Sequence, residues 1–186
     1  MPLLSLPDLH LTLEPGGAAR ATGPGAPRLW ARLAETPAST EEALPIHYKG
    51  EDIARWTPAR RRAAGLLALF ARPRAPDGLT LPQLLRASCG VNPPRGLRRT
   101  LRERAALLGV PEDLLDAPLA DARWAPFGAA AEWLQAAVLE PALVVSAAPA
   151  DAGALAASAA LRAQGAAIVF AGGGAAPDDA VLLELP

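Results

Sequence analysis

Arginine dominates the side chains that could do chemistry in this 186-residue chain. Seventeen of its 18 basic residues are arginines, and the only lysine is Lys49. Four arginines lie on one face of an expected helix, where they could bind nucleic acid or an acidic protein, although a run of charge is more often a solvated surface. No aromatic residue interleaves with them, which argues against a stacking platform for single-stranded nucleic acid. These four are Arg98, Arg99, Arg102 and Arg104.

The other reactive side chains do not form a recognisable catalytic or metal-binding set. Cys89 is the only cysteine, so it cannot form an intrachain disulfide or hold a metal cluster alone, and we interpret it as a small buried residue. His10 and His47 lack metal-ligand spacing and are expected to be structural or solvent-facing. Glycines 172–174 precede no clear helix, so we expect a turn there rather than a phosphate nest.

The formal net charge of −1 conceals three blocks of different charge. Residues 1–52 carry four basic and seven acidic side chains, residues 53–104 carry twelve and two, and residues 105–186 carry two and ten. Such asymmetry favours a charged partner or two lobes that face each other. The N-terminal residues lack the pattern of a signal peptide, and no stretch reaches the ~18 apolar residues of a membrane helix. We therefore expect a cytoplasmic protein without a membrane span.

Hydrophobic periodicity and turn residues predict an α/β fold, with residues 16–27 as a loop. Strand, helix and strand over residues 143–170 form a βαβ unit, which implies a parallel sheet. We expect one domain, with an α/β core from residues 1–54 and 126–186 and a helical lobe at 55–125. Thr57 and Asp151 are the expected N-caps of two helices. The helices are expected at 28–35, 57–70, 82–88, 96–108, 111–115, 127–139 and 152–164, and the strands at 9–13, 46–48, 143–145, 168–170 and 181–185.

This layout resembles an ABC-type ATPase, a P-loop NTPase fold with an inserted helical subdomain. The local sequence is similar to SufC, the ATPase subunit of the Suf iron–sulfur cluster assembly system. The similarity is colinear over most of the chain and is broken by deletions, so the fold it implies is a truncated one. The matching segments are residues 9–13, 50–53, 57–58, 60–62, 66–73, 78–80, 84–87, 107–110, 114–116 and 134–141.

The phosphate-binding loop of that family is missing here. Its lysine contacts the phosphates and its Ser/Thr hydroxyl binds magnesium. The corresponding residues 21–28 include Gly23 and Gly25 but no Gly-Lys-Ser/Thr, and two prolines remove backbone N–H donors. Arg28 carries a charge but does not replace a compact ammonium group.

The other catalytic motifs are missing as well. By register Ala147 and Ala148 replace the carboxylates that bind magnesium and activate water. Ala71 replaces the Q-loop glutamine, Gly172 replaces the switch histidine, and Trp124 begins the stretch that replaces the Ser-Gly-Gly-Glu signature. Five lost motifs on a retained scaffold predict a chain without ATPase activity. The aromatic group around that signature stretch, which includes Phe127 and Trp133, is interpreted as core packing rather than as a contact patch.

The resemblance therefore implies a non-catalytic SufC-like binding or regulatory subunit with no cofactor. Its expected partner is a Suf-type scaffold subunit or a functional ABC ATPase subunit. Partner-docking candidates are Arg72, Arg98, Arg99 and Arg102. Two alternatives stay open: an ABC-type protein with residual binding or hydrolysis of ATP with magnesium, and an arginine-rich binder of nucleic acid or an anionic surface. The sequence indicates no oligomeric state.

Overall fold

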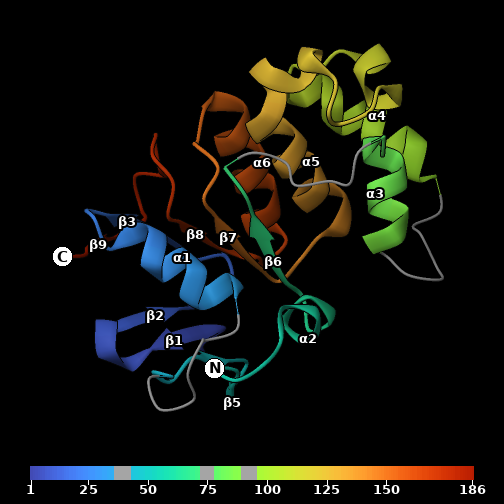
Figure 1. Ribbon diagram of the computed structural model, residues 1–186. Helices are drawn as coiled ribbons and strands as arrows, with labels where there is room; N and C mark the ends of the chain where they lie inside the picture. Colours follow the sequence, from blue (N-terminus) through green and yellow to red (C-terminus); the bar gives the residue numbers. More distant parts are fainter. Residues whose placement is uncertain (36–42, 72–77, 89–95) are drawn as a thin grey trace.

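A parallel five-stranded sheet lies at the centre of the fold (Figure 1). The computed structural model describes residues 1–35, 43–71, 78–88 and 96–186. Within the sheet every neighbouring pair of strands is parallel, as the βαβ pattern predicted. The strands, in spatial order, are β6 (Leu66–Leu69), β7 (Leu143–Ser146), β8 (Ala167–Phe170), β3 (Ala18–Thr22) and β9 (Val181–Glu184).

A smaller antiparallel sheet packs on one side of the central sheet, with helix α1 (Ala26–Ala34) packed against both. Buried leucines of the small sheet and of α1 share one hydrophobic core with one face of the large sheet. Its strands, in spatial order, are β2 (Leu11–Leu13), β1 (Leu4–Leu6), β4 (His47–Tyr48) and β5 (Glu51–Asp52).

Helices α5 (Gly128–Leu139) and α6 (Ala152–Ala163) cover the opposite face of the large sheet. Side chains alternate across a strand, so Leu143 and Val145 of β7 face α1, whereas Val144 faces α5 and α6. Both faces of β6, β7 and β8 are almost fully buried, which explains why these three strands are continuous apolar runs. None of the helices in the described residues is both long and apolar enough to cross a membrane.

The helical lobe has a hydrophobic core of its own, and α5 joins that core to the sheet. On α5, Leu134 and Val138 belong to the lobe core, whereas Trp133 packs under the sheet against Phe170. A helix that is buried nearly all round needs no polar face. The lobe contains α3 (Leu81–Ser88), α4 (Leu97–Leu107) and the short 3-10 helices η2 (Glu112–Asp116) and η3 (Ala122–Phe127).

One buried charge fastens α2 (Pro58–Ala63) to the rest of the core. The guanidinium of Arg61 is 1% exposed and donates to four backbone carbonyls. These are Arg32 O at 2.8 Å and Leu33 O at 2.7 Å in the last turn of α1, and Ile53 O at 3.1 Å and Ala54 O at 3.0 Å. A cation at a helix C-terminus is favoured by the helix dipole. Arg61 therefore holds three segments together without a carboxylate.

Two expectations about secondary structure are wrong. The helix expected through Phe70 ends at Ala63, and the apolar residues that follow form strand β6 of the central sheet. Gly65, at φ +93°, makes the turn between them. A short apolar run does not distinguish a buried strand from a buried helix by periodicity alone. This strand also falls within residues 55–125, the segment expected to form the helical lobe.

The second error concerns residues 16–27, expected to be a loop, which contain strand β3 at the heart of the sheet. Alanine is depleted in strands, so the three alanines of β3 do not indicate a strand. The other elements lie within a few residues of their expected places, although Leu9 belongs to the 3-10 helix η1 (Pro7–Leu9) rather than to a strand. Both expected N-caps are confirmed, since Thr57 accepts from Arg60 N and Asp151 from Ala154 N.

Candidate functional site

Most of the residues that replace the nucleotide-binding motifs lie at one edge of the central sheet, whereas Trp124 lies in the helical lobe. In a parallel sheet this edge, outside the carboxyl ends of the strands, is where ligands bind. Gly23 and Gly25 follow β3, Ala71 follows β6, and Gly172 follows β8. Ala147 follows β7, and its N–H donates to Leu69 O of β6 at 2.9 Å. The topology therefore brings these positions to a single edge.

The loop after β3 is only three residues long, Gly23 to Gly25, before α1 begins. Two backbone donors of the loop and of the first residue of α1 are engaged within the chain, since Gly25 N donates to Leu185 O at 3.4 Å and Ala26 N donates to Gly23 O at 3.2 Å. Two further positions are prolines and have no N–H. A phosphate cradle consists of free backbone N–H groups converging on the anion, and this loop offers few of them.

The chain segment after β9 packs directly on this loop. Leu185 N donates to Thr22 O at 2.9 Å. A Cβ atom at Gly23 would lie 2.2 Å from Leu185 O, and one at Gly25 would lie 2.7 Å from Pro186 O. The two glycines thus permit a close approach of backbone to backbone. That packing accounts for them without a nucleotide.

The backbone segments that follow β7 and β8 are also in direct contact with each other. Gly172 N donates to Ser146 O at 3.0 Å. A Cβ atom at Gly172 would lie 2.4 Å from Ala147 O and 2.8 Å from Ala148 O. The position expected for a switch histidine therefore has no room for any side chain unless the backbone moves. Ala147 and Ala148 bring only methyl groups, and Ala148 is buried.

A cavity of about 550 Å³ separates the end of β6 from the start of α5. Ala71 and Pro149 line it from the sheet, and Asp121, Trp124 and Gly128 are among the residues that line it from η3 and α5. Trp124 is buried in the lobe core, and its Nε1 has no hydrogen-bond partner among the described residues. We call this space the lobe–sheet cavity.

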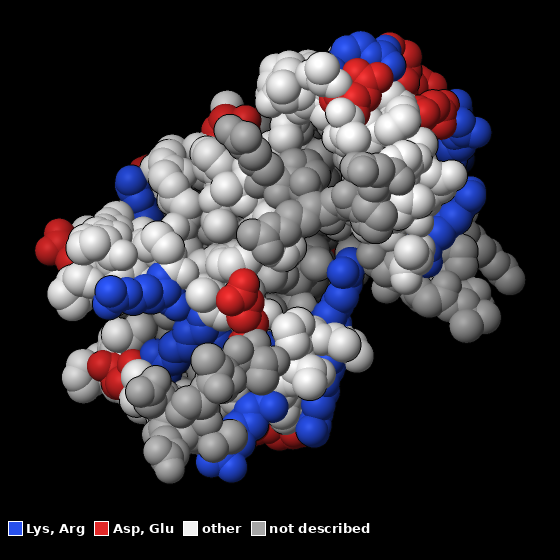
Figure 2. Space-filling model, viewed as in Figure 1, with Lys and Arg blue, Asp and Glu red and all other residues white. Residues whose placement is uncertain are grey.

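The predicted docking arginines of α4 are exposed, but each is ion-paired with an acidic residue of the lobe. Acidic and basic side chains accordingly lie next to one another over the lobe in Figure 2. Exposed pairs contribute little to stability, yet they offset the charge of three of the four arginines of α4. Arg72 lies outside the described residues. The pairs are Arg98 with Asp116, Arg99 with Glu103 at 2.9 Å, and Arg102 with Glu112 at 2.7 Å.

A buried carboxylate that the sequence reasoning missed connects α5 to the end of β6. Glu132 is 2% exposed; its Oε2 accepts from Phe70 N at 2.9 Å and its Oε1 accepts from Gln135 Nε2 at 3.2 Å. Burial raises the pKa of Glu132 to about 7, and the hydrogen bond from Phe70 opposes this rise. The available signal was one acidic residue inside a helix whose only other polar side chain is Gln135.

Comparison with solved structures identifies the fold. A nucleotide-free ATP-binding cassette from an ABC transporter is 16% identical, with a TM-score of 0.64, over 86% of this chain and 72% of that one. An ABC-transporter-type ATP-binding protein from Pyrococcus furiosus is 16% identical, with a TM-score of 0.66, over 94% and 87% of the two chains. CbiO1 from Clostridium perfringens, part of an ABC transporter complex, is 12% identical, with a TM-score of 0.61, over 91% and 77%.

No protein-family model matches the sequence, and no curated protein matches it. The chain has the α/β fold of ATP-binding cassettes, as the sequence predicted. At these identities the likeness shows the fold alone.

Proposed function

We propose that this chain is a non-catalytic protein with the ATP-binding-cassette fold and that it acts by binding a protein partner. The observation that carries the proposal is the loop after β3. The N–H of Gly25 donates to Leu185 O, Pro24 has no N–H, and the residues after β9 pack against the loop. A triphosphate would have to displace those contacts before it could reach the backbone of the loop.

The end of strand β7 also offers no carboxylate ligand for the magnesium ion that accompanies ATP. Magnesium takes oxygen ligands, with carboxylates prominent among those from protein, whereas Ala147 and Ala148 stand at the end of β7. The described residues contain no group of three or more His, Cys, Asp or Glu side chains that could hold a metal ion. Loss of one electrostatic donor alone costs roughly 10²–10³ in rate, so the combined losses support a role without turnover.

Partner binding is supported by what the chain retains. The lobe keeps a hydrophobic core of its own, and the lobe–sheet cavity opens between it and the sheet edge. Small and apolar side chains line much of that cavity, with Trp124 as its largest. In the Suf-like proteins that the sequence resembles, partners dock near this junction. A Suf-type scaffold subunit or a functional ABC ATPase subunit is therefore the partner class we propose.

Affinity capture from the native cell tests this proposal when a variant blocks the cavity. Ala71 is exposed and lines the cavity, so Ala71→Trp fills it, whereas Ala159→Trp adds the same bulk to an exposed position of α6 outside it. We expect the wild type and Ala159→Trp to retain the same Suf-type or ABC-type protein and Ala71→Trp to retain at least tenfold less. Equal capture by all three, or no partner above the tag alone, would contradict the proposal.

A further inference from the structure

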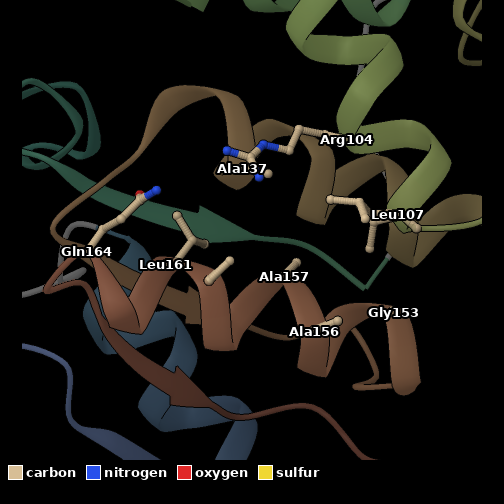
Figure 3. A pocket seen from close by; sticks show the side chains of 10 residues that line it. Arg104, Leu107, Ala137, Gly153, Ala156, Ala157, Leu161 and Gln164 are labelled. Carbon is tan, nitrogen blue, oxygen red and sulfur yellow. The ribbon is translucent and has the colours of Figure 1, made fainter.

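A second recess lies on the far side of α5 from the sheet edge, between the end of α4 and the length of α6 (Figure 3). It has a volume of about 180 Å³ and shares no lining residue with the lobe–sheet cavity. In Figure 3 Ala156 and Ala157 of α6 lie across from Arg104 and Leu107 of α4, with Ala137 of α5 behind them. We call this recess the α4–α6 groove.

The groove is mostly apolar, and one of the large hydrophobic side chains that line it is exposed to solvent. Leu107 is 67% exposed although it lines the groove. The α6 wall consists mostly of alanine and glycine, so an element that lies on it can approach the α6 backbone closely. A buried cavity of about 150 Å³ accommodates a benzene ring, so this groove has room for one aromatic or branched side chain.

The positively charged residue of this groove, Arg104, has no acidic partner among the described residues. Arg104 lines the groove and is half-buried, and among the described residues it forms no ion pair. Three other arginines of the same helix all pair with lobe acids, as described above. None of the described residues that line the groove is acidic. A ligand carboxylate would therefore meet Arg104 without competition from a lining residue.

The spacing of the two features indicates the shape of the ligand. Arg104 and Leu107 are three residues apart, so they lie on one face of α4 about one turn from each other. A partner helix presents an apolar and an acidic side chain on one face when they are three or four residues apart. Such a helix can lie along α6 and contact Arg104 and Leu107 of α4 at the same time.

We propose that the α4–α6 groove docks an amphipathic helical segment of an acidic protein partner. One bulky apolar side chain of the segment enters the groove, and a carboxylate one turn away pairs with Arg104. This surface is separate from the lobe–sheet cavity and does not depend on whether the chain binds nucleotide.

Selection from a phage-displayed library of random 12-residue peptides on the full chain tests the proposal. Clones are counter-selected on Ala156→Phe, which fills the groove from an exposed position, and Ala159→Phe is the matched control on the same helix outside it. We expect enriched peptides to carry an aromatic or branched residue with Asp or Glu three or four positions away. They should bind the wild type and Ala159→Phe alike and lose binding to Ala156→Phe.

A charge exchange then tests the role of Arg104. By fluorescence anisotropy, Arg104→Glu should weaken the best peptide roughly tenfold or more, because attraction becomes repulsion. The same peptide with Lys in place of its acid should bind Arg104→Glu better than it binds the wild type. Arg99→Glu, a reversal on the same helix outside the groove, should have little effect. No groove-dependent enrichment, enrichment without acidic residues, or equal binding to wild type and Arg104→Glu when circular dichroism shows both folded would overturn the proposal.

Discussion

The buried carboxylate of Glu132 makes stability depend on pH in a direction opposite to that of a typical acidic residue. Burial raises its pKa from an ordinary 4.5 to about 7 in the folded chain. Between those two values the unfolded chain releases the proton while the folded chain keeps it, so the free energy of unfolding falls as pH rises. The slope is about 1.36 kcal/mol per pH unit, so the free energy of unfolding falls by about 3 kcal/mol between these two pH values.

Glu132→Gln removes this titration but keeps the packing. Its amide oxygen can still accept from Phe70 N, and the amide of Gln135 can reorient to match the new group. Relative to the wild type, we expect the variant to gain up to about 3 kcal/mol of stability between pH 5 and pH 8. Urea denaturation at several pH values, followed by tryptophan fluorescence, measures the difference.

Glu14→Gln is the control for this comparison, because Glu14 is exposed. Its effect should stay within about 0.5 kcal/mol at every pH. A difference between Glu132→Gln and the wild type that does not change with pH would refute the reasoning, because it would mean that Glu132 titrates alike in the folded and unfolded chain.

Two further substitutions test the packing that holds the sheet edge and the core. Arg61→Met removes the hydrogen bonds from the guanidinium to four backbone carbonyls, of which Ile53 O keeps Trp56 N as a donor, and should lower the free energy of unfolding by about 3 to 5 kcal/mol. Arg55→Met, at an exposed position, should change it by less than about 0.5 kcal/mol. Urea denaturation distinguishes these outcomes. Gly172→Ala places a Cβ against Ala147 O and should cost about 1 to 3 kcal/mol, whereas Gly173→Ala meets no atom within 4 Å and should cost much less. Equal thermal unfolding midpoints for the two alanine variants would show that the strand ends are not closed as described.

Much of the fold was predictable because its elements carry strong local signals. The apolar runs of β7 and β8 and the N-cap at Asp151 place a βαβ unit without further information. Strand β3 was not predictable in this way. Its alanines suit the space between two neighbouring strands and two buried faces, and that space exists only once the sheet has formed.

The sequence predicted which catalytic residues the candidate site lacks, but it did not predict the contacts that the remaining residues make. The missing lysine and carboxylates are visible in the sequence. The engagement of Gly25 by Leu185 is not visible, because it joins residues that are 160 positions apart. The pairing of Arg102 with Glu112 was not visible for a related reason. Arg102 lies in the basic segment 53–104 and Glu112 in the acidic segment 105–186, and only the fold brings the two side chains together.

Isothermal calorimetry, with ATP and magnesium titrated into the full chain, tests most directly whether the sheet edge binds nucleotide. We expect no binding heat above dilution at ATP concentrations up to about 1 mM, with or without magnesium, which means a binding free energy weaker than about −4 kcal/mol. Saturable, magnesium-dependent binding in the micromolar range would contradict the account.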